Sequence, residues 1–256
     1  MPIDNKKTSG GTTIYFEEQS HKYTDNFGRT YVSITQFIHQ FLPKFEAETI
    51  AFKIAQRDGV SLESILDDWE QKRVSAAKFG TKIHRFMELY AQGKEHLWPQ
   101  EYEGKQDEKT IDYIMRGRKI IDAMKKTTEI YATEEIVFLP ELQLAGTIDL
   151  ILKKGDRYIL VDWKTNSKPI LDGGSFNKGF GALEGISDSL LNIYSIQLGL
   201  YRYIFARMMN ISVDKVSTYI VHLTEEGVKK IKTLDMSDTV EKLIKHRKEQ
   251  LCTMAQ

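Results

Sequence analysis

Hydrophobic positions recur every three or four residues along several segments of the chain, which is the spacing of an amphipathic helix. Helices are therefore expected within 46–93, at 110–124, at 189–209 and at 238–250. Closer to the N-terminus, Ser33 and Gln36 have the spacing of a capping box. A further short helix is expected to begin near Thr35 and to end by Pro43, because proline cannot continue a helix.

Short runs rich in β-branched and aromatic residues follow a different pattern and predict strands. The runs lie at 12–17, 22–24, 30–34, 131–139, 144–152, 158–163 and 216–223. Polar turn residues separate the first two runs and also fill 25–28, so a small antiparallel ribbon is expected there. Gly155 and Asp156 form a tight turn, which predicts that the strands on either side of it pair antiparallel.

The order of these elements predicts the fold class. Helices come first, followed by three strands, a helix, a strand and a last helix, which is typical of a mixed α/β core. We expect residues 1–70 to form a β ribbon and helices that pack on a core made by residues 71–256. Between 165 and 187 the chain has five glycines, and so long a loop in a compact fold is usually functional or mobile.

Composition narrows the class of protein. The 256 residues carry 36 Lys and Arg against 36 Asp and Glu, which excludes a binder that works by bulk charge but not a local basic groove. The single Cys252 excludes an internal disulfide, a four-cysteine zinc site and a four-cysteine iron–sulfur cluster. No run approaches the roughly 20 apolar residues of a membrane span. The start of the chain lacks the apolar centre of a secretory signal, so we expect a disordered lead-in and a cytoplasmic protein.

Two acidic residues and a lysine lie on the two strands that the tight turn connects. Asp149 is on the first strand, and Asp162 and Lys164 are at the end of the second. Residues two apart in a strand point to the same face, so Asp162 and Lys164 share a face and Trp163 points away. In an antiparallel pair Asp149 can approach Asp162, which predicts a pocket holding two carboxylates and an ammonium group.

Such a pocket favours a bound cation, because neighbouring carboxylates repel each other without one. Oxygen ligands suit Mg²⁺ or Mn²⁺ better than Zn²⁺. A metal ion there can polarise a phosphate oxygen and lower the pKa of a bound water, while Lys164 orients the water or stabilises charge on the phosphate. The pattern acid-x-Lys is common in the chain, so an ion pair that caps a strand is the alternative interpretation.

The run GTID at 146–149, followed by DWKT at 162–165, resembles the PD-(D/E)xK nuclease superfamily, particularly its RecB-like exonuclease branch. The longer run DWKTNSKP is similar to the mitochondrial genome maintenance exonuclease group, and the N-terminal ribbon is similar to phage-type members. The resemblance covers about residues 75–205. It implies a restriction-endonuclease-like fold, in which helices flank a mixed central sheet.

Two further motifs match the same branch. Gly80-x-x-x-His84 is similar to its upstream motif, whose histidine is a metal ligand, although a lone histidine on an apolar helix is more often a core residue. Gln197-x-x-x-Tyr201 is similar to its downstream helical motif, which lies near the active site and the nucleic-acid strand. Glu88 follows His84 by one helical turn and is either its hydrogen-bond partner or an exposed helix charge.

The resemblance implies a ligand set for Mg²⁺ or Mn²⁺. Its members are His84, Asp149, Asp162 and the backbone carbonyl of Trp163. Lys164 would activate water, and Gln197 would position the strand. The mitochondrial group also has an acid before the GTID strand, which is Glu134 or Glu135 here. Strand parity turns only one of them inward, and spacing favours Glu134.

The implied function is a metal-dependent DNA exonuclease that prefers single-stranded ends. A phage or bacterial origin is expected, because the start of the chain shows no Arg-rich, acid-poor transit peptide. Contacts with the phosphates of nucleic acid come mainly from Lys and Arg, and the candidates are Lys82, Arg85 and Lys168. A further candidate for binding nucleic acid is Tyr201, because its motif lies near the nucleic-acid strand in the family. The basic cluster at 238–250 is expected to be a solvated face. Phe176 and Phe180 either stack on bases or anchor their loop. The chain has no P-loop motif, so a motor would have to be a separate helicase.

Two other functions fit the same sequence. One is a structure-selective or sequence-specific endonuclease on the same core. The other is a catalytically silent module that binds nucleic acid, which would be indicated by loss of an acid or of the lysine. Asp149, Asp162 and Lys164 are all present, which favours an enzyme.

Overall fold

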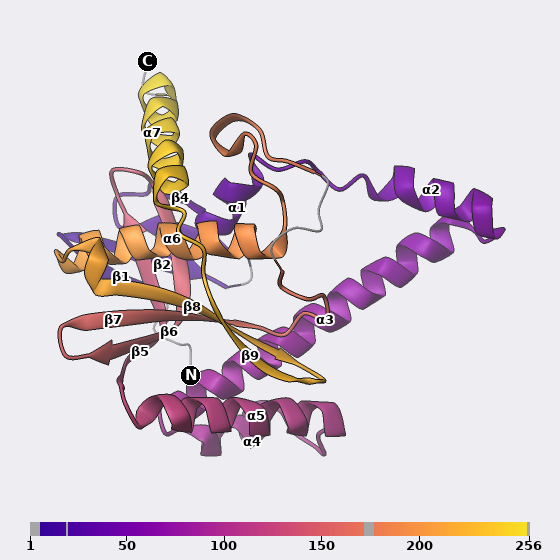
Figure 1. Ribbon diagram of the computed structural model, residues 1–256, viewed down its shortest axis with the longest axis horizontal. Coiled ribbons are helices and arrows are strands. Elements are labelled where there is room, and N and C mark those ends of the chain that lie inside the picture. Colours follow the sequence, from indigo (N-terminus) through magenta and orange to yellow (C-terminus); the bar gives the residue numbers. More distant parts are fainter. Residues whose placement is uncertain (1–5, 19, 172–176, 255–256) are drawn as a thin grey trace.

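The structure is a computed structural model that describes residues 6–18, 20–171 and 177–254. Within these residues the chain forms one nine-stranded sheet and seven α-helices (Figure 1). The strands are β1 (Lys6–Ser9), β2 (Thr12–Glu17), β3 (Lys22–Asp25), β4 (Thr30–Ser33), β5 (Glu129–Leu139), β6 (Leu144–Lys154), β7 (Arg157–Lys164), β8 (Val216–Thr224) and β9 (Gly227–Lys232). The helices are α1 (Ile34–His39), α2 (Ala47–Asp58), α3 (Leu62–Ala91), α4 (Trp98–Glu101), α5 (Glu108–Lys125), α6 (Leu190–Met209) and α7 (Ser237–Met254).

The strands follow the order β1-β2-β3-β4-β6-β7-β8-β9, and β5 pairs with the other edge of β6. The pairs β4–β6 and β7–β8 are parallel, and the others are antiparallel. The predicted antiparallel pair around the turn at Gly155 is therefore confirmed. The mixed α/β class is confirmed too, and the arrangement is consistent with the restriction-endonuclease-like fold that the resemblance implies.

One edge of β6 pairs with two different strands, β4 and β7, and the sheet is divided between them. On that edge β4 pairs with Leu144 and Ala145, whereas β7 pairs only from Leu150 onward. The segment 146–149, which is GTID, lies between these two pairings. Side chains and backbone groups of GTID can therefore meet other parts of the chain at this division of the sheet.

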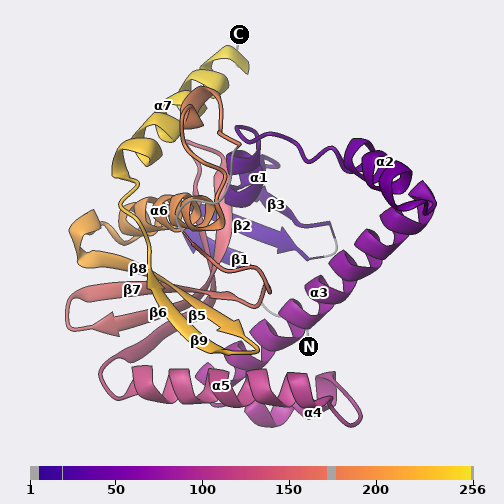
Figure 2. The ribbon, with the colours of Figure 1, turned by 45° about the vertical axis from the view of Figure 1, so that its right-hand side comes forward.

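Helices cover both faces of the sheet (Figures 1 and 2). One face packs against α1, α6 and α7 through residues such as Phe37, Leu198 and Leu243. The other packs against α3 and α5 through Met87 and Ile121. The buried residues of α3 all lie from Ile83 onward, and its first half extends away from the sheet beside α2 (Figure 1). None of the helices in the described residues is long and apolar enough to cross a membrane.

Most predicted elements are present where the hydrophobic pattern places them. The capping box of Ser33 and Gln36 starts α1. The helical stretch at 46–93 is two helices, because Gly59 adopts a left-handed conformation and ends α2. The ribbon continues the main sheet through the β4–β6 pair, and the expected boundary at residue 70 falls inside α3.

Two strands were missed, and one of them corrects an expectation. The expected disordered lead-in contains β1, which pairs with β2 and whose Lys7 forms an ion pair with Glu135. No hydrophobic residue marks β1, so its sequence lacks a strand pattern. The other missed strand, β9, is rich in lysine, as is common for strands at sheet edges, where charge discourages further pairing.

Candidate active site

Gly146 lets a helix approach the division of the sheet. A Cβ atom at this position would lie 2.5 Å from Cε1 of Tyr201 on α6, so only glycine fits without displacing the ring. The next residue, Thr147, has its Oγ1 3.0 Å from the Tyr23 hydroxyl on β3. Helix α6 and the N-terminal ribbon therefore both contact the GTID segment.

Asp149 connects three elements. Its Oδ2 accepts the backbone N–H of Trp163 on β7 at 2.7 Å. The same oxygen lies 3.5 Å from Nδ1 of His84 on α3. The regular β6–β7 pairing ends at Leu150 and Val161, so the carboxylate satisfies an amide beyond the end of the ladder.

His84 reaches Asp149 because α3 passes close to the end of β7. Gly80, one turn earlier on the helix, permits this approach, since a Cβ there would lie 3.3 Å from Oγ1 of Thr165. The His84 side chain is 29% exposed. His84 thus lies at the partly open edge of the site beside a carboxylate, and not in the apolar core.

Glu134 completes the group from β5. Thr133 pairs with Leu150 and Glu135 with Ile148, so the register places Glu134 across from Asp149. The backbone of Glu134 is left-handed, with φ of 47°, which is rare for a residue other than glycine. Glu135 faces the other way and pairs with Lys7, so the structure turns Glu134 toward the site, as spacing suggested.

Three residues bring possible ligand atoms within 4.8 Å of one another: His84, Glu134 and Asp149. Burial raises the pKa of Glu134 well above its ordinary value, and the charges of Asp149 and Glu88 raise it further. Burial also raises the pKa of Asp149, with Asp162 adding to the effect and His84 opposing it. Negative charge here is poorly compensated. One imidazole and two carboxylates therefore fit a divalent cation such as Mn²⁺ or Mg²⁺.

Asp162 and Lys164 lie together beside this group. Lys164 Nζ is 2.7 Å from Asp162 Oδ2 and 4.4 Å from the centre of the Tyr194 ring on α6. Trp163 is buried on the opposite face of the sheet, so the predicted strand parity is correct. Within the described residues, Asp162 is not part of the group formed by His84, Glu134 and Asp149. Asp162 instead forms an ion pair with Lys164 at the end of the strand.

The charge of Lys164 depends on its two acidic neighbours. Burial disfavours the ammonium, but Asp162 and Asp149 outweigh burial and raise the pKa of Lys164. Lys164 is therefore protonated at neutral pH. Oδ2 of Asp162 is buried and makes no hydrogen bond of good geometry within the part of the chain that the structure describes, despite its nearby ammonium. It therefore retains capacity to accept another partner.

Gln197 and Tyr201 meet on one face of α6, where the amide of Gln197 donates to the Tyr201 hydroxyl at 3.4 Å. Tyr201 is only 5% exposed and packs on Gly146. Its predicted contact with nucleic acid is therefore corrected: the ring is part of the core, and its hydroxyl orients Gln197. Gln197 itself is partly exposed.

The predicted cationic contacts differ in how available they are. Arg85 is 19% exposed and forms ion pairs with Glu88 and Glu101. Lys82 lies over the rings of Trp98 and Tyr102, at 5.9 and 6.0 Å. Lys168 is exposed. Arg85 is thus neutralised within the protein, whereas Lys168 is open to a phosphate.

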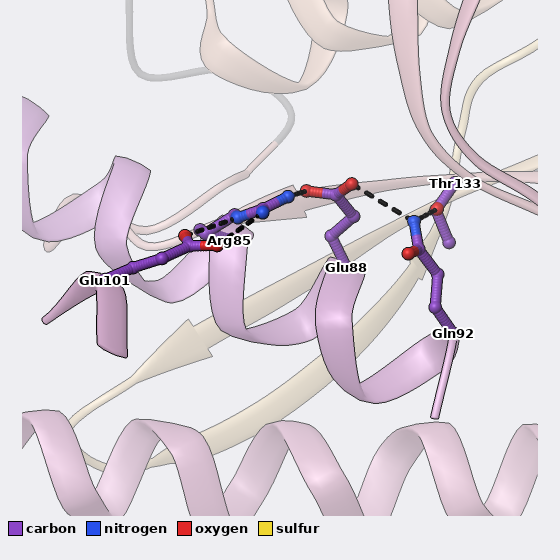
Figure 3. A network of polar contacts seen from close by, with 5 residues as sticks. All are labelled: Arg85, Glu88, Gln92, Glu101 and Thr133. Carbon is purple, nitrogen blue, oxygen red and sulfur yellow. Dashed lines mark hydrogen bonds and ion pairs between the residues drawn. The ribbon is translucent and has the colours of Figure 1, made fainter. Parts of the chain in front are cut away.

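Glu88 is neither an exposed helix charge nor a hydrogen-bond partner of His84 in the described structure. It is 7% exposed, and it binds Arg85 and Gln92 instead of His84 (Figure 3). In the glycine-rich loop, Phe176 lies outside the described residues. Phe180 is exposed, and its backbone N–H donates to the carbonyl of Phe41.

Sequence reasoning missed His222, a buried residue on β8. It stands beside Lys164 in the parallel register, and its Nε2 lies 2.7 Å from the carbonyl oxygen of Asn166. It also missed Arg247 as a core residue, whose guanidinium donates to the carbonyls of Leu142 and Gln143. His222 lies inside the strand predicted at 216–223, but no motif in the sequence connects it with Lys164. Arg247 belongs to the basic cluster that is expected to be a solvated face, and its burial corrects that expectation for this residue.

Comparison with known proteins gives one broad match. The model of the PD-(D/E)XK nuclease superfamily matches residues 49–256. A search of curated proteins gave no significant match.

Two of the solved structures that match this chain are distantly similar to it. A candidate exonuclease from Eubacterium rectale is 13% identical with a TM-score of 0.49, over 88% of this chain and 80% of that chain. The protein SSO0001 is 15% identical with a TM-score of 0.27, over 67% of this chain and 74% of that chain.

Proposed function

Because the chain belongs to the PD-(D/E)XK nuclease superfamily, we propose that it is a divalent-metal-dependent exonuclease that hydrolyses DNA from single-stranded ends. The observation that carries the proposal is the meeting of His84, Glu134 and Asp149 beside the Asp162–Lys164 pair. The preference for DNA and for single-stranded ends follows from the resemblance of the GTID and DWKT segments to the RecB-like branch.

His84, Glu134 and Asp149 would hold the cation, with Asp162 and the carbonyl of Trp163 as further proposed ligands. A divalent ion bound there supplies a Lewis acid for a phosphate oxygen and makes a bound water more acidic. The Trp163 N–H fixes Asp149 in one orientation, so the ligand does not have to be ordered when the ion arrives.

Lys164 supplies positive charge to the reaction. Asp162 and the Tyr194 ring hold its ammonium in place, and its raised pKa keeps it protonated. A protonated lysine cannot accept a proton from water. It can donate hydrogen bonds to a water molecule or to a phosphate oxygen on which charge develops. Gln197, oriented by Tyr201, offers an amide that can bind the strand.

A nuclease assay tests the proposal. Single-stranded and duplex DNA, labelled at either end, would be incubated with Mg²⁺ or Mn²⁺, with Asp149→Asn as the inactive control. We expect a ladder of products from single-stranded ends of the wild type and none from the variant. Discrete internal cuts would identify an endonuclease instead. The assay is repeated with labelled RNA, and survival of both DNA and RNA with Mg²⁺ and with Mn²⁺ would favour a catalytically silent binding module.

A further inference from the structure

A chain of polar contacts runs from α4, along the last turns of α3, to β5 (Figure 3). Arg85 donates to both carboxylate oxygens of Glu101 at 2.6 and 2.7 Å and to Glu88 Oε2 at 2.6 Å. Gln92 Nε2 donates to Glu88 Oε1 at 3.1 Å and to Thr133 Oγ1 at 2.7 Å. We call these five residues the Gln92 network.

The network fixes the direction of the Gln92 amide. Glu88 is buried, and a buried carboxylate must be paired and hydrogen-bonded to be tolerated. One of its oxygens is bound by Arg85 and the other by Gln92. Gln92 is also the C-cap of α3, so its backbone is held by the end of the helix. The contact between Gln92 and Thr133 is therefore well oriented.

Thr133 immediately precedes Glu134, whose left-handed backbone is unfavourable for a residue with a Cβ atom. Such a conformation persists only when the surrounding structure holds it. Both neighbours of Glu134 are held from outside β5. Thr133 is bound to α3 through Gln92, and Glu135 is bound to β1 through Lys7.

We propose that the Gln92 network is a positioning device that holds Glu134 in the conformation that directs its carboxylate toward His84 and Asp149. Helix α3 then has two functions in the site. It carries His84, and two turns later Gln92 at its C-cap holds Thr133 of β5. A single rigid helix thereby sets the separation of His84 from Glu134. The inference rests on the proposed function only in that the site binds a divalent cation.

The test uses isosteric and conservative variants of Thr133 in the full chain. Thr133→Val keeps the shape of the side chain but cannot accept the bond from Gln92, whereas Thr133→Ser keeps the hydroxyl. Calorimetric titration of the metal-free protein with MnCl₂ should show affinity about tenfold weaker in Thr133→Val, as for other residues that orient metal ligands. Thr133→Ser should stay within about twofold of the wild type.

Glu70→Gln is the matched control, because Glu70 lies on the exposed part of α3 and pairs with Arg73. It should leave the affinity for Mn²⁺ unchanged. Unfolding in EDTA would show that each variant folds. Equal affinity of Thr133→Val and wild type would overturn the inference.

A crystal structure of metal-free Thr133→Val gives a readout that does not depend on metal. We expect Glu134 to leave the left-handed region, and an unchanged backbone would overturn the inference even if the wild type bound no Mn²⁺. Nuclease activity is scored separately. A wild type that binds Mn²⁺ but cuts nothing, together with weaker binding by Thr133→Val, would refute the proposed function and support the Gln92 network.

Discussion

The carboxylate of Asp149 accepts a hydrogen bond from the backbone N–H of Trp163, with 2.7 Å between Oδ2 and the nitrogen. This bond joins the GTID segment of β6 to the DWKT segment of β7 just beyond the end of their regular pairing. Because Asp162 and Lys164 flank Trp163, the bond also sets the position of that ion pair relative to Asp149. The two motifs thus form one structural unit.

Glu134→Gln should stabilise the metal-free protein. Burial raises the pKa values of Glu134 and Asp149, and repulsion between nearby carboxylates adds to the effect. The substitution replaces the Glu134 carboxylate by a neutral amide, which lowers the cost of burial and removes part of the repulsion. We expect the free energy of unfolding in EDTA to rise above that of the wild type. Thermal unfolding in EDTA and in MnCl₂ measures this, and the variant should also lose the stabilisation by Mn²⁺.

Glu135→Gln is the control, because Glu135 is adjacent but faces Lys7. It should not gain stability in EDTA, and it should keep the response to Mn²⁺. If both variants behaved alike, repulsion within the site would not be the cause.

Stability of the metal-free protein should fall as pH rises. The folded state raises the pKa of Glu134 above 4.5, so between that value and the raised one the folded state binds more protons than the unfolded state. Stability then decreases with pH across this window. Urea unfolding in EDTA at a series of pH values from 4.5 upward measures the slope. The slope should be shallower in Glu134→Gln, and an unchanged slope would mean that another group titrates.

Lys164→Met should abolish most cleavage while leaving the metal site in place. A buried donor aimed at developing charge typically contributes about 10²–10³ in kcat. We expect a loss of that size with little change in Mn²⁺ affinity, because Lys164 is not one of the candidate ligands. Single-turnover cleavage together with calorimetry separates the two quantities. Loss of Mn²⁺ binding with normal folding would show that Lys164 acts on the metal site instead.

Gly146→Ala should destabilise the fold by about 1–3 kcal/mol, the usual cost of overpacking a core. The added Cβ would lie 2.5 Å from the Tyr201 ring, whereas the Cβ of Gly80→Ala would meet a hydroxyl at 3.3 Å and should cost less. Urea unfolding compares the two variants. In a double-mutant cycle, Tyr201→Leu should reduce the cost of Gly146→Ala, and full additivity would exclude the Tyr201 contact as the cause.

Where the hydrophobic period is clear, the sequence predicts the fold well. Helices α5 and α6 and strands β5 to β8 bury regular apolar faces, so their positions follow from the pattern of hydrophobic residues along the chain. Strands β1 and β9 do not, because they are held by pairing with a neighbouring strand rather than by apolar burial. Strand parity likewise predicts that Asp162 and Lys164 share a face.

The rest of the site depends on contacts between distant segments. The left-handed backbone of Glu134 has no local signature, since glutamate rarely adopts it. Glu88 looks like a helix surface charge in sequence. Its partners Arg85 and Gln92 are its neighbours by helical spacing, but its burial depends on the packing of α3 against the rest of the fold. Tyr201 shares a motif with Gln197, yet Gly146 across the fold decides that its ring is buried.

The most direct test of the central claim is a crystal structure of the wild type soaked in MnCl₂, with anomalous data that locate the ion. The account predicts an anomalous peak coordinated by His84, Glu134 and Asp149, which Asp149→Asn abolishes. A well-ordered structure whose Mn²⁺ lies elsewhere, with these three side chains bound to no metal at saturating concentration, would contradict it.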